Sequence, residues 1–195
     1  MQDDRRFVLA LRVDDTCAEG PGRRTALWVQ GCPFRCPGCC NPQMQAFTGG
    51  TWVDVDDEIE RLAALDVDGI TLLGGEPFAH APALARLARG VRAQGKTVMA
   101  FSGYTLAQLQ GDIVVGAAAL LQACDLLVDG LYVQSQPETE RRWIGSRNQR
   151  MHFLSSAYDP ADPCFTQRNT VELRLRGDGV VVNGWPTPDG PMGRR

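Results

Sequence analysis

A chain of 195 residues with 44% hydrophobic and 22% charged residues is long enough for one domain with a sizeable core, and this composition excludes wholesale disorder. The formal net charge is −3 and no basic stretch stands out, so the sequence gives no footprint for nucleic-acid binding. The apolar run 7–13 contains Arg12 and is too short for a signal peptide or a membrane span, which predicts a cytoplasmic protein. In a reducing compartment seven cysteines indicate metal binding or reactivity rather than disulfides.

The first part of the chain alternates short apolar runs with amphipathic segments. Residues 26–30 predict a buried strand that leads directly into a cysteine-rich loop. Apolar residues then recur at helical spacing over 55–62, with Asp54 or Asp56 available as the N-cap. The next strand is expected at 69–73, where it ends in a glycine-rich turn.

The same alternation continues to the middle of the chain. The elements expected there are a helix from near Pro82 to Gly95, a strand at 97–101, a short helix capped by Thr105, a helix within the alanine-rich run 113–124 and a strand at 125–128.

Apolar strands joined by helices and short connections predict a parallel sheet covered by helices. Polar and glycine-rich residues follow the strand ends at Gln30, Leu73, Phe101 and Val128. In parallel α/β folds this edge binds ligands, so the four strand ends are expected to face one site. The strands are too few for a closed eight-stranded barrel, which favours an open, partial (β/α) barrel.

The pattern changes after Leu154. Residues 170–176 alternate with period two and 180–182 continue in the same way beyond a turn, which predicts an appended C-terminal β-hairpin. The expected organisation is a core over 1–154, a hairpin extension over 155–185 and a loose tail over 186–195.

Three cysteines, Cys32, Cys36 and Cys39, follow the first predicted strand at a C-x3-C-x2-C spacing. Three thiolates on one loop can bind three irons of an iron–sulfur cluster and leave the fourth open for a substrate. Structural zinc is the alternative, but it prefers four ligands. No second C-x2-C pair exists, and His80 and His152 are distant in sequence.

The other cysteines are expected to have no ligand role. Cys40 follows Cys39 directly, and its side chain should point away, towards packing or the surroundings of the metal site. Cys17, Cys124 and Cys164 are isolated and are expected to be small buried residues.

Residues 20–32, together with the three cysteines and Asn41, resemble the signature of radical S-adenosylmethionine activating enzymes, which install glycyl radicals in partner proteins. Within that group the chain is most similar to the activating proteins of anaerobic ribonucleoside-triphosphate reductase. Four later motifs match in order: Gly74-Gly75-Glu76-Pro77 resembles GGEP, Ser102-Gly103-Tyr104 resembles Thr-Gly-Tyr, Val128-Asp129-Gly130 resembles Val-Asp-Gly, and residues 145–150 resemble Gly-Ser-x-Asn-Gln-Arg.

The resemblance implies a partial barrel of the radical S-adenosylmethionine type and a specific cofactor set. Cys32, Cys36 and Cys39 would hold a [4Fe–4S] cluster, whose open iron would chelate S-adenosylmethionine and cleave it reductively to a 5′-deoxyadenosyl radical. The GGEP segment, made of Gly74, Gly75, Glu76 and Pro77, would lie beside the methionine end. There the glycines allow close approach and Glu76 could accept a hydrogen bond from an ammonium group. The alternative is a turn with a solvated glutamate.

Two interpretations remain open for each of three further side chains. Ser102 and Asp129 could contact the ribose or the methionine, or could be helix caps or turn residues. Tyr104 could belong to the core or could line the cofactor pocket.

The resemblance implies an activase with a protein substrate and an electron donor such as flavodoxin or ferredoxin. The alternatives are a radical enzyme that modifies a peptide or a small metabolite, and a non-catalytic electron-transfer or zinc-binding module. The chain departs from the family at Ala18-Glu19, where activators usually carry Asp, and in the hairpin and tail after Leu154. Gly38 replaces an aromatic residue that is common in the superfamily, although the reductase activators also tend to have glycine there.

Overall fold

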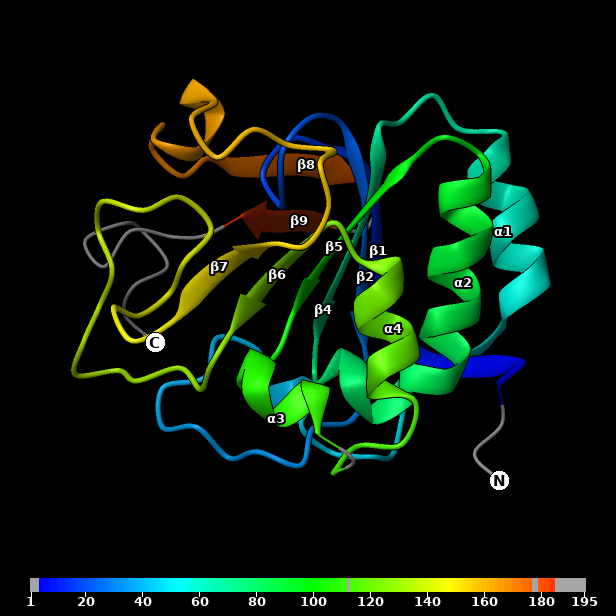
Figure 1. Ribbon diagram of the computed structural model, residues 1–195, viewed down its shortest axis with the longest axis horizontal. Helices are drawn as coiled ribbons and strands as arrows, with labels where there is room; N and C mark the ends of the chain where they lie inside the picture. The colour runs from blue at the N-terminus through cyan, green and yellow to red at the C-terminus, as the bar shows by residue number, and fades with distance from the viewer. Residues whose placement is uncertain (1–3, 112, 177–178, 185–195) are drawn as a thin grey trace.

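A computed structural model describes residues 4–111, 113–176 and 179–184. Its main element is a seven-stranded mixed sheet with the strand order β3-β1-β2-β4-β5-β6-β7 (Figure 1). The strands are β1 (Arg6–Thr16), β2 (Arg24–Val29), β3 (Thr51–Asp54), β4 (Gly69–Gly74), β5 (Thr97–Phe101), β6 (Leu126–Asp129) and β7 (Arg150–Phe153). β2, β4, β5 and β6 run parallel, which confirms the predicted parallel centre. β1, β3 and β7 are antiparallel additions at the two edges, which the sequence analysis did not predict as strands.

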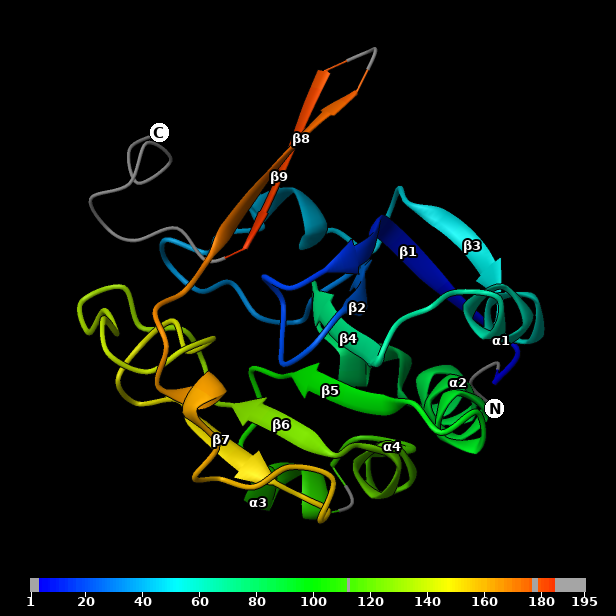
Figure 2. The same cartoon turned by 90° about the horizontal axis from the view of Figure 1, so that it is seen from above.

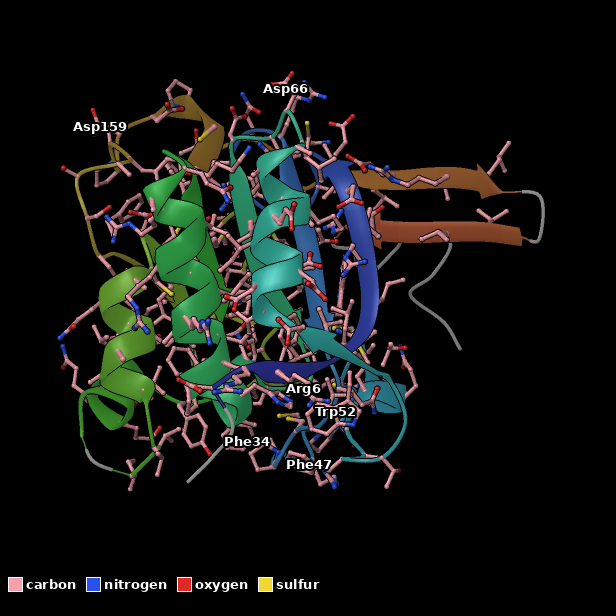
Figure 3. The ribbon with its side chains drawn as sticks, turned by 90° about the vertical axis from the view of Figure 1, so that its right-hand side faces the viewer. Arg6, Phe34, Phe47, Trp52, Asp66 and Asp159 are labelled. Atoms are coloured by element: carbon pink, nitrogen blue, oxygen red, sulfur yellow. The ribbon has the colours of Figure 1, made fainter. Side chains whose placement is uncertain are left out.

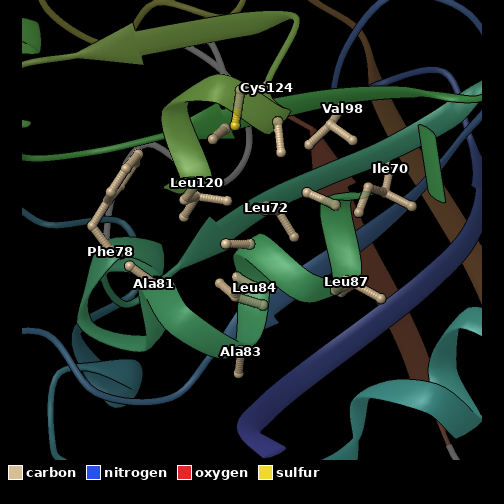
Figure 4. Close-up of a cluster of buried hydrophobic side chains, with 14 of the residues drawn as sticks. Ile70, Leu72, Phe78, Ala81, Ala83, Leu84, Leu87, Val98, Leu120 and Cys124 are labelled. Atoms are coloured by element: carbon tan, nitrogen blue, oxygen red, sulfur yellow. The ribbon is translucent and has the colours of Figure 1, made fainter. Parts of the chain in front are cut away.

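The helices cover one face of this sheet (Figures 1 and 2). They are α1 (Val55–Ala63), α2 (Ala81–Ala93), α3 (Leu106–Gln110) and α4 (Ala117–Ala123), with single 3₁₀ turns at η1 (Pro42–Met44), η2 (Pro77–His80) and η3 (Pro163–Phe165). In the largest apolar cluster Ile70 and Leu72 of β4 are fully buried together with Leu84 and Leu87 of α2 (Figure 4). No helix in the described part of the chain is long and apolar enough to cross a membrane.

Local capping chemistry explains where the helices begin. Asp54 caps α1 by accepting the N–H of Asp56, as predicted. Thr105 forms a complete capping box with Gln108 at the start of α3. The alanine-rich helix is shorter than predicted, because Gly116 adopts a φ of +80° and α4 starts only at Ala117.

Arg24 lies fully buried on the face of the sheet opposite the helices. Its guanidinium donates to the hydroxyl oxygens of Thr71 at 2.8 Å, Thr97 at 3.0 Å and Tyr158 at 3.0 Å, and to the carbonyl oxygen of Ile70. These partners belong to β4, to β5 and to the segment after β7. One side chain of β2 thus connects three strands to the C-terminal extension.

The C-terminal residues form the predicted hairpin from β8 (Val171–Arg176) and β9 (Gly179–Gly184). It projects from the body of the protein (Figure 2). Three polar side chains connect it to the end of β1: Arg174 donates to the carbonyl oxygens of Asp14 and Asp15, Asn183 donates to Thr16 Oγ1, and Glu19 accepts the N–H of Gly184. The division into core, hairpin extension and tail stays a prediction, and residues 186–195 lie outside the described residues.

Arg24→Met is expected to lower the free energy of unfolding by about 3 kcal/mol, because it leaves several buried oxygens without donors. The measurement is urea denaturation. Arg23→Met is the matched control: Arg23 is exposed and pairs with Asp15 and Asp66, so its loss is expected to leave the midpoint almost unchanged. Equal midpoints for the two variants would show that Arg24 does not stabilise the fold.

A pH dependence is expected at the base of the hairpin, because burial raises the pKa of Glu19 to about 7. A folded-state pKa above the unfolded value of 4.5 means that the contribution of Glu19 to stability is fully present below pH 4.5 and is lost as the pH rises through 7. Wild type is therefore expected to lose about 3 kcal/mol relative to Glu19→Gln over this range. Urea denaturation of both proteins at a series of pH values tests this, and parallel pH profiles would contradict it.

Candidate functional site

The cysteine loop begins where β2 ends, at the carboxyl edge of the parallel strands. Gly31 donates its N–H to the carbonyl oxygen of Met44 at 2.9 Å, and Cys32 donates to that of Gln45 at 3.1 Å. The carboxamide of Gln30 donates to the carbonyl oxygen of Ala46 at 2.7 Å. The segment around η1 therefore fixes the start of the loop by backbone contacts.

The thiols of Cys32, Cys36 and Cys39 face a common region. All three residues are half-buried. Burial raises the pKa of Cys32 to about 11 and also raises that of Cys36, and the neighbouring charges of Glu76 and Cys39 raise both pKa values further. Backbone hydrogen bonds act in the opposite direction, from Phe34 on Cys32 and from Tyr132 on Cys36. Such bonds to sulfur are a feature of iron–sulfur sites.

Three cysteines on one loop match the donor set of an iron–sulfur cluster with an open iron. No group of three or more Cys, His, Asp or Glu side chains in the described part of the chain lies close enough together to hold one metal ion. A [4Fe–4S] cluster with an open iron needs three thiolates, and the loop supplies three half-buried thiols, which leaves a fourth position for substrate.

The GGEP segment lies directly against the cysteine loop. Gly75 donates its N–H to the carbonyl oxygen of Val29 at 2.8 Å, and Glu76 donates to that of Gly31 at 2.9 Å. A Cβ on Gly75 would lie 2.3 Å from the Gly31 oxygen, and Gly74 has a φ of +107°. Both glycines are therefore needed for this close approach.

Glu76 is buried, so the interpretation as a solvated turn residue is wrong. Its carboxylate accepts the N–H of Phe78 at 3.0 Å, the hydroxyl of Ser102 at 2.9 Å and the N–H of Gly103 at 2.8 Å. Burial raises its pKa to about 7, against the lowering effect of these donors. The carboxylate thereby ties the end of β4 to the end of β5. Pro77 follows as the first residue of η2.

The turn after β5 reaches the cysteine loop from the other side. Ser102 is buried and also accepts the N–H of Tyr104 at 3.1 Å. The ring of Phe34, from the cysteine loop, lies against Gly103, where a Cβ would be 2.6 Å away. Tyr104 is half-buried, packs against the core and meets the Phe34 ring edge to face at 4.7 Å. Tyr104 thus joins the core to the loop.

Asp129 lies at the end of β6 and is buried. It accepts the N–H of Leu106 at the start of α3, and its carboxylate oxygen is 3.1 Å from His152 Nε2 of β7. Its oxygen Oδ2 therefore accepts an N–H at the start of α3, which corresponds to the helix-cap interpretation of Asp129. Gln149 closes the loop after β6, because its amide accepts from Gly145 and Ser146 and donates to Gly130.

The structure also shows a supporting residue that the sequence analysis missed. His80 of η2 lies with Nε2 2.8 Å from the carbonyl oxygen of Gln30, immediately before the cysteine loop. Burial lowers its pKa, which favours the neutral ring. No spacing in the sequence indicated this contact, because 50 residues separate the partners.

The remaining cysteines differ from expectation in part. Cys124 is buried, as predicted. Cys17 is exposed and Cys164 is half-buried, so the prediction that both are buried is wrong. Cys40 is exposed as a residue, but burial of its thiol raises the thiol's pKa to about 12, and the charges of Cys39 and Cys36 raise it further, which agrees with a place beside the predicted metal site. Cys17 follows the end of β1 on a surface turn, where nothing covers its side chain fully.

Comparison with known proteins gives a consistent match over this region. The family model described as a 4Fe-4S single cluster domain matches residues 18–152. The anaerobic ribonucleoside-triphosphate reductase-activating protein of Vibrio cholerae is 34% identical over 142 residues, which cover 68% of this chain and 89% of that protein. The corresponding protein of Escherichia coli K12 is 35% identical, with 69% and 91% covered. The crystal structure of QueE from Escherichia coli matches 51% of this chain and 53% of its own, with a TM-score of 0.42 and 17% identity.

Glu76→Gln is expected to lower the free energy of unfolding by about 2 kcal/mol, because one carboxamide oxygen cannot serve three donors and the NH₂ group must face one of them. Ser102→Ala is the matched control: it removes one of the three bonds and is expected to cost about 1 kcal/mol. Urea denaturation measures both, and a Glu76→Gln protein as stable as wild type would contradict the bridging role.

Proposed function

The chain belongs to the family of anaerobic ribonucleoside-triphosphate reductase-activating proteins, and we propose that it activates such a reductase by installing a glycyl radical in it. The protein is a radical S-adenosylmethionine oxidoreductase with a 4Fe-4S domain. The observation that carries the proposal is the set of three half-buried thiols, on a loop held against the buried Glu76 where the parallel strands end.

The residues present can be assigned to the two cofactors. Cys32, Cys36 and Cys39 would hold the [4Fe–4S] cluster. When bound, the reduced cluster and S-adenosylmethionine supply a 5′-deoxyadenosyl radical that abstracts hydrogen. The three thiols would hold the cluster, and the half-buried loop would keep water away from one side of it.

The GGEP segment is proposed to lie beside the methionine end of S-adenosylmethionine. Gly74 and Gly75 allow the segment to lie against the end of β2 and the start of the cysteine loop, because a Cβ on either would meet Trp28 or the Gly31 oxygen. Glu76 already accepts three hydrogen bonds, but a carboxylate offers about four sites, so one acceptor position remains for an ammonium group. Ser102 and Asp129 are proposed to lie near the ribose or the methionine.

The wider setting follows from the same proposal. The sheet is proposed to be a partial (β/α) barrel, and its open side would be closed by a protein substrate. A protein of the flavodoxin or ferredoxin type would supply the electron, in the cytoplasm.

Cys36→Ser is expected to lose the cluster, because three thiolates are the minimum that can hold it with an open iron. After anaerobic reconstitution, iron and sulfide content should fall at least tenfold. Release of 5′-deoxyadenosine from S-adenosylmethionine and dithionite should fall to a similar extent. Cys40→Ser is the control, since this exposed neighbour is assigned no ligand role, and it should retain cluster and release.

The outcomes separate the alternatives. Release by Cys36→Ser at the wild-type level would overturn the ligand assignment. A wild-type protein that binds metal but releases no 5′-deoxyadenosine would be an electron-transfer or zinc-binding module. Release without a glycyl-radical paramagnetic resonance signal in the reductase would favour a peptide or small-metabolite substrate.

A further inference from the structure

Exposed large apolar side chains occur in two separate regions of the described chain. One group, Val171, Leu173, Leu175 and Val180, lies on the projecting hairpin. The other group comes from segments at the carboxyl edge of the sheet, where the cysteine loop lies: Phe47, Trp52, Ile113, Val115 and Leu131. Exposed apolar side chains that gather around a site indicate an interaction surface.

Two members of the second group flank the cysteine loop directly. The ring of Phe47, 60% exposed, lies against Gly31, where a Cβ would be 2.5 Å from it. Leu131, 43% exposed, lies on the opposite flank against Gly103, the same glycine that the Phe34 ring contacts. Figure 3 shows Phe34, Phe47 and Trp52 at one end of the molecule, opposite the end that carries Asp66 and Asp159.

The cysteine loop and the segment that follows it are also poor in charge. From Gly31 to Val53 the only charged residue is Arg35, although 22% of the chain is charged. The Arg35 guanidinium donates to the carbonyl oxygens of Cys32 and Phe34, so it is engaged within the loop itself. Depletion of charge together with exposed aromatic residues is typical of the centre of a protein interface.

We propose that Phe47, Trp52 and Leu131 form an apolar collar that docks the glycine-bearing segment of the partner polypeptide, through uncharged side chains on either side of that glycine. The inference rests on the proposed function and deepens it. A small metabolite could occupy the thiol site but could not cover side chains on both flanks of the loop. A polypeptide segment can do both, because the glycine enters between the flanks while its neighbours pack on the aromatic rings.

The test measures the rate of glycyl-radical formation in the anaerobic ribonucleoside-triphosphate reductase of the same organism, by paramagnetic resonance, as a function of reductase concentration. Trp52→Ala and Leu131→Ala are each expected to raise the KM for the reductase about tenfold, with kcat changed by less than about twofold. Phe47→Ala should act in the same direction, and its iron content is measured alongside because Phe47 packs on the residue before Cys32. Leu175→Ala is the matched control: Leu175 is 84% exposed on the hairpin, and its KM should equal that of wild type.

Added salt should leave the wild-type KM nearly unchanged, because the collar is uncharged. A wild-type KM for both Trp52→Ala and Leu131→Ala would overturn the collar, as would a raised KM in Leu175→Ala alone. A collar-dependent homodimer, seen as wild-type dimers and Trp52→Ala monomers in sedimentation, would also overturn it. Failure of the proposed function has a different signature, since wild type would then give no radical in the reductase at any concentration.

Discussion

Arg24 carries a positive charge into the interior of the fold without a carboxylate in contact. Burial lowers its pKa, but an arginine stays protonated in proteins. The free-energy cost of removing this charge from water must therefore be offset by hydrogen bonds. Each of these bonds goes to a neutral oxygen on another element: Thr71 on β4, Thr97 on β5 and Tyr158 beyond β7. The donors of a planar guanidinium point in fixed directions, so satisfying them sets how these strands lie relative to one another.

At the carboxyl end of the same strands, an acidic side chain is buried and held by hydrogen bonds. Glu76 is buried at the carboxyl edge and is surrounded by donors from Phe78, Ser102 and Gly103. Those donors fix the turn after β5, and Gly75 brings the end of β4 against Gly31. The cysteine loop therefore packs on these two strand ends, although much of the loop itself is exposed. Arg24 and its partner Tyr158 thus organise the amino end of the sheet, while Glu76 and the cysteine loop lie at the carboxyl end.

The sequence predicted what depends on local chemistry and on the period of the apolar pattern. Asp54, Thr105 and Pro82 mark helix starts because capping and φ restriction act over a few residues. The parallel order of the central strands then brought Glu76 and the cysteine loop to one edge by topology alone. What escaped prediction depends on distant partners. β1 mixes charged residues with apolar ones, and an arginine such as Arg24 is usually exposed. The three donors to Glu76 come from positions that no spacing rule connects.

An enzyme that generates a radical must exclude water and oxygen at the moment of reaction, yet the cysteine loop is only half-buried in this chain. Within the described residues, the segment after β6 reaches the loop, where Tyr132 donates a backbone hydrogen bond to Cys36 and Gln134 lies against Gly38. The hairpin and the segment after β7 make polar contacts at the other end of the sheet, through Arg174, Asn183 and Tyr158. Under the proposed function, the remaining cover would come from the substrate. A rim of Phe47 and Leu131 around the loop makes this possible, since apolar surface that is unfavourable in water becomes favourable only when the partner is in place. In this arrangement the site would be closed only when the polypeptide that receives the radical is bound.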